Sequence, residues 1–504
     1  MFCSIHTCSL SGTSGVPITA ETTLYNGLPY FYLVGLPDNI VRESKERIRA
    51  AIYSCGLTFP SRRITVNLAP AHIKKAGSAF DFPIAMSILC AQGLLPSDPD
   101  SLLSQSVLIG ELSLNGELRP VPGALVMTQC ALEHGFKRIV LPYQNAHEAS
   151  YIDGIDIIGV HTLSEAFEFF RGFLSIQPTP YHQLTSTVPD PTPLLTLQGQ
   201  PLTLRTLTIA AAGFHPLILW GPPGTGKTLA ASALATLLPP LTPTEALETA
   251  SIYSSIGSPI PPGRPFRTPH HTITPHALIG GGNPVHPGEI TLAHHGILFL
   301  DELPEFSRFS LEALRQPLQE HHIHIGRVNQ NVCFPANFLF IASMNPCPCG
   351  FHPDRNRCHC SDTQIRGYLR RLQSPLFDRI DLGIHMRTPE FDDLSPTSSA
   401  TFDTLQSQIF AAHTYQKQRY AKMPFSYNSH IPPELLSEYC PLDSDGAALM
   451  RTAYEHYKLS VRGYHRILKV ARTIADLAGS EHIHPSHISE ALQLRAIDSL
   501  QLYT

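Results

Sequence analysis

One stretch, "LILWGPPGTGKTLAASALATLL" at residues 217–238, constrains this chain most, because an apolar strand pattern runs into a glycine-rich turn and then into a helical pattern. That order is the context of a P-loop. Glycines let the backbone approach phosphate oxygens, so that N–H groups at the start of the helix point toward an anion. The motif predicts an α/β fold with a nucleotide site formed by Gly221, Pro222, Pro223, Gly224, Thr225, Gly226, Lys227 and Thr228.

Two side chains of the motif and two further along predict the chemistry of that site. Lys227 is expected to neutralise the β and γ phosphates of ATP, and Thr228 to bind Mg²⁺ through its hydroxyl. A second apolar run, "ILFL", ends in Asp301 and Glu302. Asp301 is predicted to complete the magnesium shell, and Glu302 to orient and deprotonate the attacking water.

A third apolar run, "NFLFIASMN", ends in Asn345, which we expect to position water or to sense the γ-phosphate. Downstream, "SPLFDRIDL" contains Arg379, and "SVRGYHRILK" contains Arg462 with Arg466 one helical turn later. Cationic groups neutralise charge on a transferring phosphoryl group, and one can come from an adjacent subunit as an arginine finger. A single arginine is more often a solvated surface residue. The order of these arginines after the nucleotide motifs is what favours a role for them.

Pattern divides the chain into four parts. Residues 1–174 mix short β-type runs with helical patterns, which indicates an α/β layer. Residues 175–193 are rich in proline and are predicted to be a linker. Strands and helices alternate again over residues 194–392. Helical periodicity takes over in residues 393–504 and predicts a helical bundle.

Composition limits the classes of partner and compartment. A net charge of −5 and 15% charged residues exclude a chain that binds polyanions over its whole surface, so any nucleic-acid contact must be local. The 11 cysteines are too scattered for a secreted disulfide framework. No leader pattern opens the chain, and no apolar stretch approaches the roughly 20 residues that span a bilayer. We therefore expect a soluble, cytoplasmic protein without a membrane partner.

Four cysteines gather in the stretch "CPCGFHPDRNRCHC". Two CxC pairs can surround one tetrahedral Zn²⁺ when the loop between them brings the pairs together. The spacing departs from the usual CxxC knuckles, and His352 and His359 are alternative ligands. Reduced structural cysteines and redox-regulated thiols are the other interpretations. The preferred one is a structural zinc, between Asn345 and Arg379 in the chain, bound by Cys347, Cys349, Cys358 and Cys360.

The P-loop, the acidic strand, Asn345, Arg379 and the helix with Arg462 together resemble an AAA+ ATPase. The segments "RPFRTPHHT", "ALIGGGNPVHPGEITLAHHGILFLDELPEF", "MNPCPCG" and "YHRILKVARTIADL" look like the ComM/YifB group of magnesium-chelatase-like AAA+ proteins, and the resemblance covers nearly the whole chain. It implies an AAA+ core with a C-terminal helical lid, ATP and magnesium as cofactors, and a homo-oligomeric ring, a hexamer. By resemblance, Arg379 matches the finger and Arg462 the lid sensor.

Members of this group are described as competence-related, and ComM-type members as ring-forming helicases that drive DNA branch migration in recombination. By resemblance, the insert "GRPFRTPHHTITPHALIGGG" and the hairpin pattern "QEHHIHIGRVNQNVCFPANF" line the channel of the ring. Loops of this composition are more often plain surface loops. The candidate phosphate ligands are Arg264, Arg267, His270, His271 and Arg327.

The implied function is an ATP-driven motor on single-stranded or branched DNA, acting in recombination or natural transformation, with recombination proteins as further partners. One alternative is a magnesium-chelatase-like ATPase that remodels a protein partner. Another is an ATP-dependent protease, because the N-terminal part bears a second resemblance.

The segments "KKAGSAFDFPIAM" and "GELSLNGELRPVPGALVMTQCALEHGFKRIVLPYQN" look similar to the protease domain of Lon, which cuts with a serine and lysine pair. In that alignment Asp81 stands at the serine position and Leu125 at the lysine position, with Ser78 close by. Since neither the nucleophile nor the base is in place, we expect a Lon-protease-like α/β fold without peptidase activity.

Overall fold

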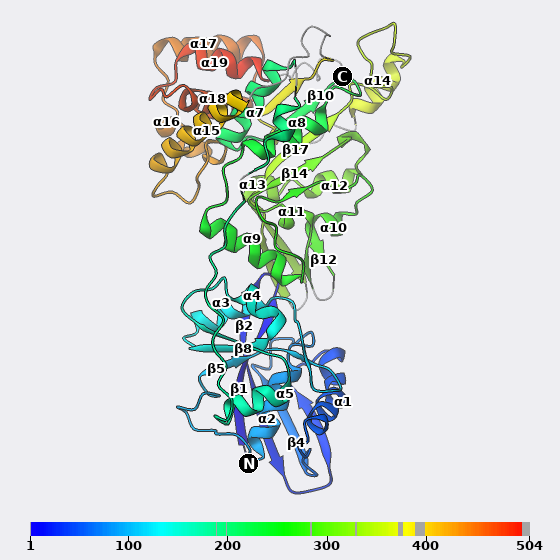
Figure 1. Cartoon of the computed structure of the whole chain (residues 1–504). Coiled ribbons are helices and arrows are strands. Elements are labelled where there is room, and N and C mark those ends of the chain that lie inside the picture. Colours follow the sequence, from blue (N-terminus) through cyan, green and yellow to red (C-terminus); the bar gives the residue numbers. More distant parts are fainter. Residues whose placement is uncertain are drawn as a thin grey trace.

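The computed structural model of the chain describes residues 2–187, 189–197, 199–282, 285–327, 330–370, 376–388 and 399–495. These residues form an N-terminal sheet module, a second sheet module and a C-terminal helical bundle (Figure 1). The N-terminal module and the bundle lie at opposite ends of the molecule, with the second sheet between them. The predicted α/β fold with a helical C-terminal region is confirmed.

The N-terminal module is built on a mixed sheet. Its strands are β1 (Phe2–Ser11), β2 (Ser14–Tyr25), β3 (Tyr30–Val34), β4 (Arg63–Ala69), β5 (Ser106–Leu108), β8 (Arg138–Pro142) and β9 (Asp156–Val160). They are ordered β3-β4-β2-β1-β5-β8-β9. β1 and β2 form a long antiparallel hairpin in which Ile5 pairs with Ala20. A small antiparallel pair, β6 (Glu111–Leu112) and β7 (Leu118–Arg119), lies beside the sheet.

Helices cover both faces of this sheet. They are α1 (Asn39–Ser54), α2 (Asp81–Ala91), α3 (Ala124–Glu133), α4 (Tyr143–Ala149) and α5 (Leu163–Phe170). α1, α2 and α5 pack around Val140 on one face, whereas α3 and α4 pack around Ile139 on the other. Ile139 and Val140 point to opposite faces because successive residues of a strand face opposite sides of a sheet. A disulfide joins Cys3 of β1 to Cys90 of α2, and no pattern in the sequence indicated it.

The proline-rich segment between α5 and α6 (Thr192–Leu195) has no helix or strand in its described residues. Its backbone is nevertheless anchored at several points. The Thr179 and His182 N–H groups donate to Ile157 O and Ser150 O, and the Thr187 N–H group donates to Pro262 O at 2.8 Å. The segment therefore runs along the N-terminal module and then reaches the second one.

The second sheet is parallel, and its three central strands are fully buried. Its strands are β10 (Leu217–Trp220), β11 (Phe266–Arg267), β14 (Ile297–Leu300), β17 (Leu339–Met344) and β18 (Leu382–His385), in the order β11-β14-β17-β10-β18. Because both faces are covered, β10, β14 and β17 are continuous apolar runs. The carboxyl ends of these three neighbouring strands therefore meet at one edge of the sheet.

Helices α7 (Pro201–Gly213) and α8 (Lys227–Leu237) pack on one face of the second sheet, in a core that the bundle shares. α9 (Pro243–Ser255) begins at a capping box, in which Thr242 and Glu245 exchange hydrogen bonds. The other face is covered by shorter elements: α10 (Pro275–Ile279), α11 (Glu289–Leu292), η1 (Leu303–Glu305), α12 (Arg308–Ala313), α13 (Pro317–Glu320) and α14 (Asp362–Arg370).

Two hairpins extend from the second sheet module. β12 (Gly280–Gly281) pairs with β13 (His286–Pro287), and β15 (His322–Arg327) pairs with β16 (Gln330–Pro335). The hairpin predicted before the third apolar strand is thus confirmed. Residues 283–284 and 328–329 at the two tips lie outside the described residues.

The bundle consists of α15 (Ser399–Arg419), α16 (Leu436–Tyr439), α17 (Ser444–His456), α18 (Val461–Leu477) and α19 (Pro485–Gln493), with short turns η2 (Phe377–Arg379), η4 (Asn428–His430) and η5 (Pro433–Leu435) before and between them. The expected start of this part at residue 393 lies outside the described residues. In the ranges that the structure describes, no helix is both long and apolar enough to cross a lipid bilayer.

A buried polar chain joins the second sheet to the bundle. His215 follows α7 and is fully buried. Its Nδ1 lies 2.7 Å from Asp381 Oδ2, just before β18, and its Nε2 lies 2.7 Å from Thr473 Oγ1 on α18. Buried polar groups are costly unless they are hydrogen-bonded. These hydrogen bonds therefore fix how the bundle sits on the second sheet.

Asp476, one turn along α18, is the centre of a second buried cluster. Arg419 of α15 donates two hydrogen bonds to its carboxylate, at 2.6 and 2.9 Å, and Arg472 donates one at 3.1 Å. Asn428 of η4 donates another at 2.8 Å. The side chains of Asp476 and Arg472 are only 1% and 2% exposed. The Asp476 carboxylate therefore accepts hydrogen bonds from two arginines and offsets their positive charge inside the bundle.

The two sheet modules contact each other through α3 and α9. Leu125 of α3 packs with Ile152 and with Ala250 of α9 in a small apolar cluster. A second contact lies at the β1–β2 turn, where a Cβ on Gly12 would come within 2.6 Å of Val332 Cγ1 on β16. The N-terminal module thus touches both α9 and the β15–β16 hairpin.

Candidate functional site

The glycine-rich turn connects β10 to α8 at the carboxyl edge of the second sheet. Gly224 and Gly226 have φ values of +81° and +83°, in the left-handed region that favours glycine. Gly221 lies against the backbone of Met386, where a side chain would not fit. α8 starts after Gly226 without a side-chain cap, which leaves the N–H groups of its first turn available to an anion.

The Lys227 ammonium is held over this turn by three acceptors. Nζ donates to Gly221 O at 2.8 Å, to Pro222 O at 2.9 Å and to Asn345 Oδ1 at 3.1 Å. Burial lowers the pKa of Lys227, and the charges of Asp301 and Glu302 oppose that shift. The structure therefore brings together the lysine of the turn, both carboxylates of the second strand and the amide of the third.

Asp301 is oriented by groups on three elements. Its Oδ2 lies 3.4 Å from Thr228 Oγ1 of α8, and its Oδ1 accepts from the Glu302 N–H at 3.0 Å and from the Ser343 hydroxyl of β17. A hydroxyl beside a carboxylate is an oxygen donor set that fits Mg²⁺. Ser343 was not predicted. The one signal for it is a small polar residue inside an otherwise apolar strand.

Glu302 combines an exposed carboxylate with a strained backbone. Its φ is +54°, an unusual value for a residue other than glycine, and such outliers gather at functional sites. Its Oε2 lies 3.8 Å from His271 Nδ1. His271, which was expected to contact DNA, therefore lies beside the proposed general base.

The two downstream arginines form a separate group of charges. Arg379 of η2 donates to Gln319 Oε1 at 2.9 Å, and burial, with the nearby Arg315 and Arg462, lowers its pKa. Arg462 is 68% exposed and lies 3.7 Å from Asp378 of the same turn. The finger and sensor candidates therefore lie close to each other, on η2 and α18.

Arg466, one helical turn after Arg462, fixes the backbone of that turn. Its Nη1 donates to Phe377 O at 3.1 Å and to Ile380 O at 2.7 Å. These bonds span the residues on either side of Arg379. α18 of the bundle therefore sets the position of the finger candidate.

Comparisons with known proteins match nearly the whole chain. A family model described as "Magnesium chelatase, subunit ChlI" matches residues 194–394, and related models of the same subunit match residues 20–145 and 399–495. The chain is 40% identical to YifB of Salmonella typhimurium over 508 residues, which are 99% of this chain and 98% of YifB. It is 40% identical to the competence protein ComM of Haemophilus influenzae over 496 residues, 96% of each chain.

The chain belongs to the ComM/YifB group of magnesium-chelatase-like AAA+ proteins. This AAA+ family implies an ATPase that uses ATP with magnesium and assembles into oligomers. A weaker similarity concerns the N-terminal part: 145 residues are 26% identical to Lon protease 2 of Bacillus subtilis, covering 29% of this chain and 25% of that protein.

Arg264, a candidate DNA ligand in this AAA+ chain, has its guanidinium engaged within the protein. Nε donates to Pro239 O and Nη1 to His295 O, both at 2.6 Å, and Nη2 lies 3.2 Å from Glu245. Its side chain is 9% exposed. These internal hydrogen bonds argue against a phosphate contact by Arg264.

The other candidate phosphate ligands differ among themselves. Arg267 forms a bidentate pair with Glu289 at 2.7 and 2.8 Å, so it contributes a compensated charge. His270 is exposed, with its ring 4.1 Å from that of His271. Arg327 ends β15, and its side chain lies outside the described part of the structure.

The Lon-like module carries an ion pair at Asp81, which the resemblance to Lon was expected to place at the serine position. Asp81 is fully buried at the start of α2, and Arg47 of α1 donates to its two oxygens at 2.7 and 3.0 Å. Burial raises the pKa of Asp81 against the effect of Arg47. Leu125, at the lysine position, is buried in the contact with α9. Ser78 lies just before α2, where its carbonyl accepts the Asp81 N–H.

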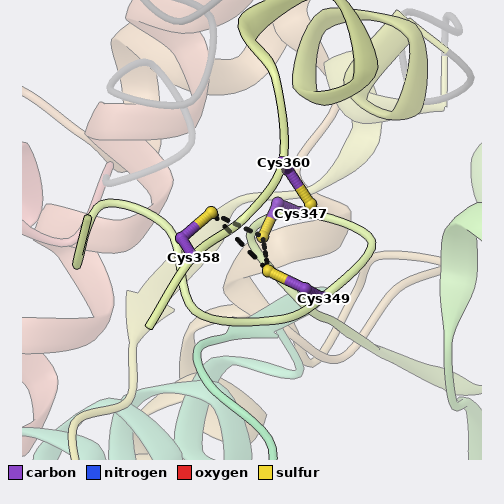
Figure 2. Close-up of side chains that lie close together, drawn as sticks. All are labelled: Cys347, Cys349, Cys358 and Cys360. Carbon is purple, nitrogen blue, oxygen red and sulfur yellow. Dashed lines mark hydrogen bonds between the residues drawn. The ribbon is translucent and has the colours of Figure 1, made fainter. Parts of the chain in front are cut away.

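The four clustered cysteines converge in the loop between β17 and α14 (Figure 2). In the described chain they form one group whose sulfur atoms all lie within 4.8 Å of one another. His352 and His359, the alternative ligands, do not belong to that group. The His352 backbone N–H instead donates to Cys347 Sγ at 3.4 Å.

Proposed function

We propose that this AAA+ protein is an ATP-hydrolysing ring motor, a hexamer, that moves DNA through or along its channel in the cytoplasm. Its proposed task is branch migration as a helicase in recombination or natural transformation. The proposed ATP hydrolysis rests on the convergence of Lys227, Asp301 and Asn345 at one edge of the sheet. The proposed action on DNA is supported by similarity over 96% of the chain to a protein named for competence.

Each group of the nucleotide site has a proposed role. The N–H groups of the turn and the Lys227 ammonium bind the phosphates, and Asn345 positions the attacking water. Thr228 and Asp301 hold Mg²⁺, which neutralises charge on the β and γ oxygens when bound. Glu302 orients the water and takes its proton. No peptidase activity is expected, because the buried Asp81 is paired with Arg47 and is no nucleophile.

Arg379 is proposed to act as a finger on the nucleotide of a neighbouring subunit, and Arg462 is proposed to be the lid sensor. Their charges lie together on η2 and α18, whereas Asp301 and Glu302 surround Lys227. A ring in which η2 of one subunit faces the P-loop of the next would complete each site with a finger, which is worth about 10³–10⁵ in rate. Such a site needs a second copy of the chain.

Mixing inactive variants tests this arrangement. We expect Arg379→Ala and Lys227→Ala proteins to be inactive alone, and an equal mixture to regain about a quarter of the wild-type ATPase rate when interfaces act independently. The reason is that about one interface in four pairs an intact P-loop with an intact finger. Each variant mixed with itself is the control. A mixture no more active than its separate components would mean that Arg379 acts within its own subunit.

DNA stimulation of the ATPase tests the choice of substrate. We expect single-stranded or branched DNA to raise the ATPase rate and Arg327→Ala to weaken DNA binding, reducing its salt-dependence slope by about one, because one phosphate contact is lost. Arg308→Ala is the matched control, since Arg308 is an exposed arginine paired with Glu312. Equal DNA affinity in both variants would show that Arg327 is not part of the DNA interface.

A second candidate function is a magnesium-chelatase-like ATPase that remodels a protein partner. Two observations favour it: the family model over residues 194–394 is described as a chelatase subunit, and Arg264 and Arg267 are engaged within the chain. An ATPase rate that is unchanged by single-stranded, duplex and branched DNA, in a protein that does not bind them, would favour this function over the motor on DNA.

A further inference from the structure

The cysteine cluster has the dimensions of a metal site. Cys347 Sγ lies 3.3 Å from Cys349 Sγ and 3.8 Å from Cys358 Sγ, and the latter two are 3.6 Å apart (Figure 2). In a tetrahedral site with metal–sulfur bonds of about 2.3 Å, sulfur atoms stand about 3.8 Å apart. The cysteines are not joined as disulfides. Their spacing therefore matches four ligands around one ion.

Backbone donors support charge on the central sulfur. The Gly350 N–H donates to Cys347 Sγ at 3.2 Å, and the His352 N–H donates to the same atom at 3.4 Å. Metals bind the thiolate form, and N–H groups aimed at a ligand stabilise it and fix its orientation. The turn that supplies the first donor requires φ of +88° at Gly350, which glycine adopts readily.

The loop itself needs such a centre. Between β17 and α14 it forms no helix or strand, and its residues 353–357 are exposed. The apolar contacts of this segment come mainly from the cysteines and Phe351. A loop of this kind is commonly held by its metal, whose binding energy then contributes to folding.

A second group of possible ligands in the described residues, around Glu248, differs in kind. There His294 Nδ1 accepts the Asn337 N–H at 3.0 Å. The Nε2 atoms of His294 and His295 lie 3.3 and 2.6 Å from the same Glu248 oxygen. This group is a hydrogen-bonded chain of histidines on a carboxylate, whereas the four thiols converge on one point.

The cysteine loop lies directly on the P-loop. A Cβ at Gly350 would come within 2.6 Å of Pro223 Cδ, so the two turns are in close contact. The loop also begins two residues after Asn345, and Tyr368 of α14 lies close to the Asn345 backbone. Whatever holds the cysteines together thus holds both the phosphate turn and the amide that contacts Lys227.

We propose that one divalent cation of the zinc class is bound tetrahedrally by the four cysteines, and that this ion clamps the loop against Pro223 so that metal occupancy sets the affinity for nucleotide. The ligands are Cys347, Cys349, Cys358 and Cys360. Zinc suits the site because its sulfur-rich sites are tetrahedral and closed. The metal part stands by itself, whereas the clamp part rests on the proposed nucleotide site.

Metal analysis of the full-length protein tests the first part. We expect about one zinc per chain in protein purified without added metal, and its stoichiometric release when a mercurial titrates the thiols. The Cys349→Ser, Cys360→Ser double variant should lose zinc, and Cys333→Ser, at an exposed cysteine outside the cluster, should keep it. Wild-type protein that contains no zinc, or contains iron instead, would overturn the assignment. The measurement on wild-type protein does not depend on the folding of any variant.

Nucleotide binding to Gly350→Ala tests the clamp. The added methyl group presses on Pro223 at a left-handed position, so we expect affinity for a fluorescent ATP analogue to fall by about tenfold while zinc content stays at the wild-type level. Gly367→Ala, at a helical glycine with open space around its Cβ, is the control. Unchanged affinity in Gly350→Ala would refute the clamp. If wild-type protein binds no nucleotide at all, the proposed function fails while the zinc result stands.

Discussion

Replacing Glu302 with glutamine is expected to lower the rate of ATP hydrolysis by about 10²–10⁴-fold while nucleotide stays bound, because general-base catalysis contributes factors of that size. Glutamine keeps the length and hydrogen-bonding shape of the side chain but cannot accept the proton of the attacking water. Because the side chain at position 302 is exposed and a φ of +54° is equally demanding for glutamate and glutamine, the site accepts glutamine as well as glutamate. Steady-state kcat and the binding of a fluorescent ATP analogue measure the two effects separately.

Two further variants make this result specific. Glu305→Gln changes an exposed carboxylate in η1, three residues away, and should leave kcat within about twofold of wild type, as surface changes generally do. Lys227→Ala should instead abolish nucleotide binding, because it removes the charge that neutralises the phosphates. A Glu302→Gln protein that turns over like wild type would assign the base to another residue.

Replacing Asp476 with alanine is expected to cost about 3–5 kcal/mol of unfolding free energy, the range for breaking a buried ion pair from one side. Asp476 is the shared acceptor of Arg419 and Arg472, and Arg472 is almost fully buried. Its removal leaves two arginines facing a low-dielectric interior. Urea denaturation, followed by a signal from the bundle, measures the loss.

Glu490→Ala provides the matched control for Asp476. Glu490 of α19 also forms a bidentate pair, with Arg205 of α7, but the two side chains are 30% and 37% exposed. Such solvated pairs contribute about 0–1 kcal/mol. Equal destabilisation by the two substitutions would show that the burial of Asp476 does not determine its contribution.

Much of the nucleotide site could be predicted because its signals are local in sequence. Lys227 follows a glycine-rich turn, and Asp301 and Asn345 each follow an apolar strand. Parallel strands that neighbour one another bring such ends to one edge of the sheet. The residues of the site could therefore be recognised from the strand pattern, and the parallel order of the strands explains why they converge.

Other parts of the site depend on partners far away in the chain. Arg264 was predicted to be a DNA ligand from its charge and its loop. Its partners in the structure are Pro239 and Glu245, which precede it in the sequence, and His295, which lies just before β14. Ser343 points to Asp301 only because β14 and β17 are neighbours in this register. Strand order and side-chain pairing are tertiary facts, and no local pattern encodes them.

The contact between α3 and α9 disfavours a lysine at position 125. Leu125 occupies, by similarity to Lon, the position of the catalytic lysine, and it is packed against Ala250. A lysine there would carry a charge into an apolar cluster and force the two modules apart. Serine at position 81 would at the same time strip Arg47 of its carboxylate. Installing the serine and lysine pair would therefore destabilise both the contact between the modules and the interior of the N-terminal module.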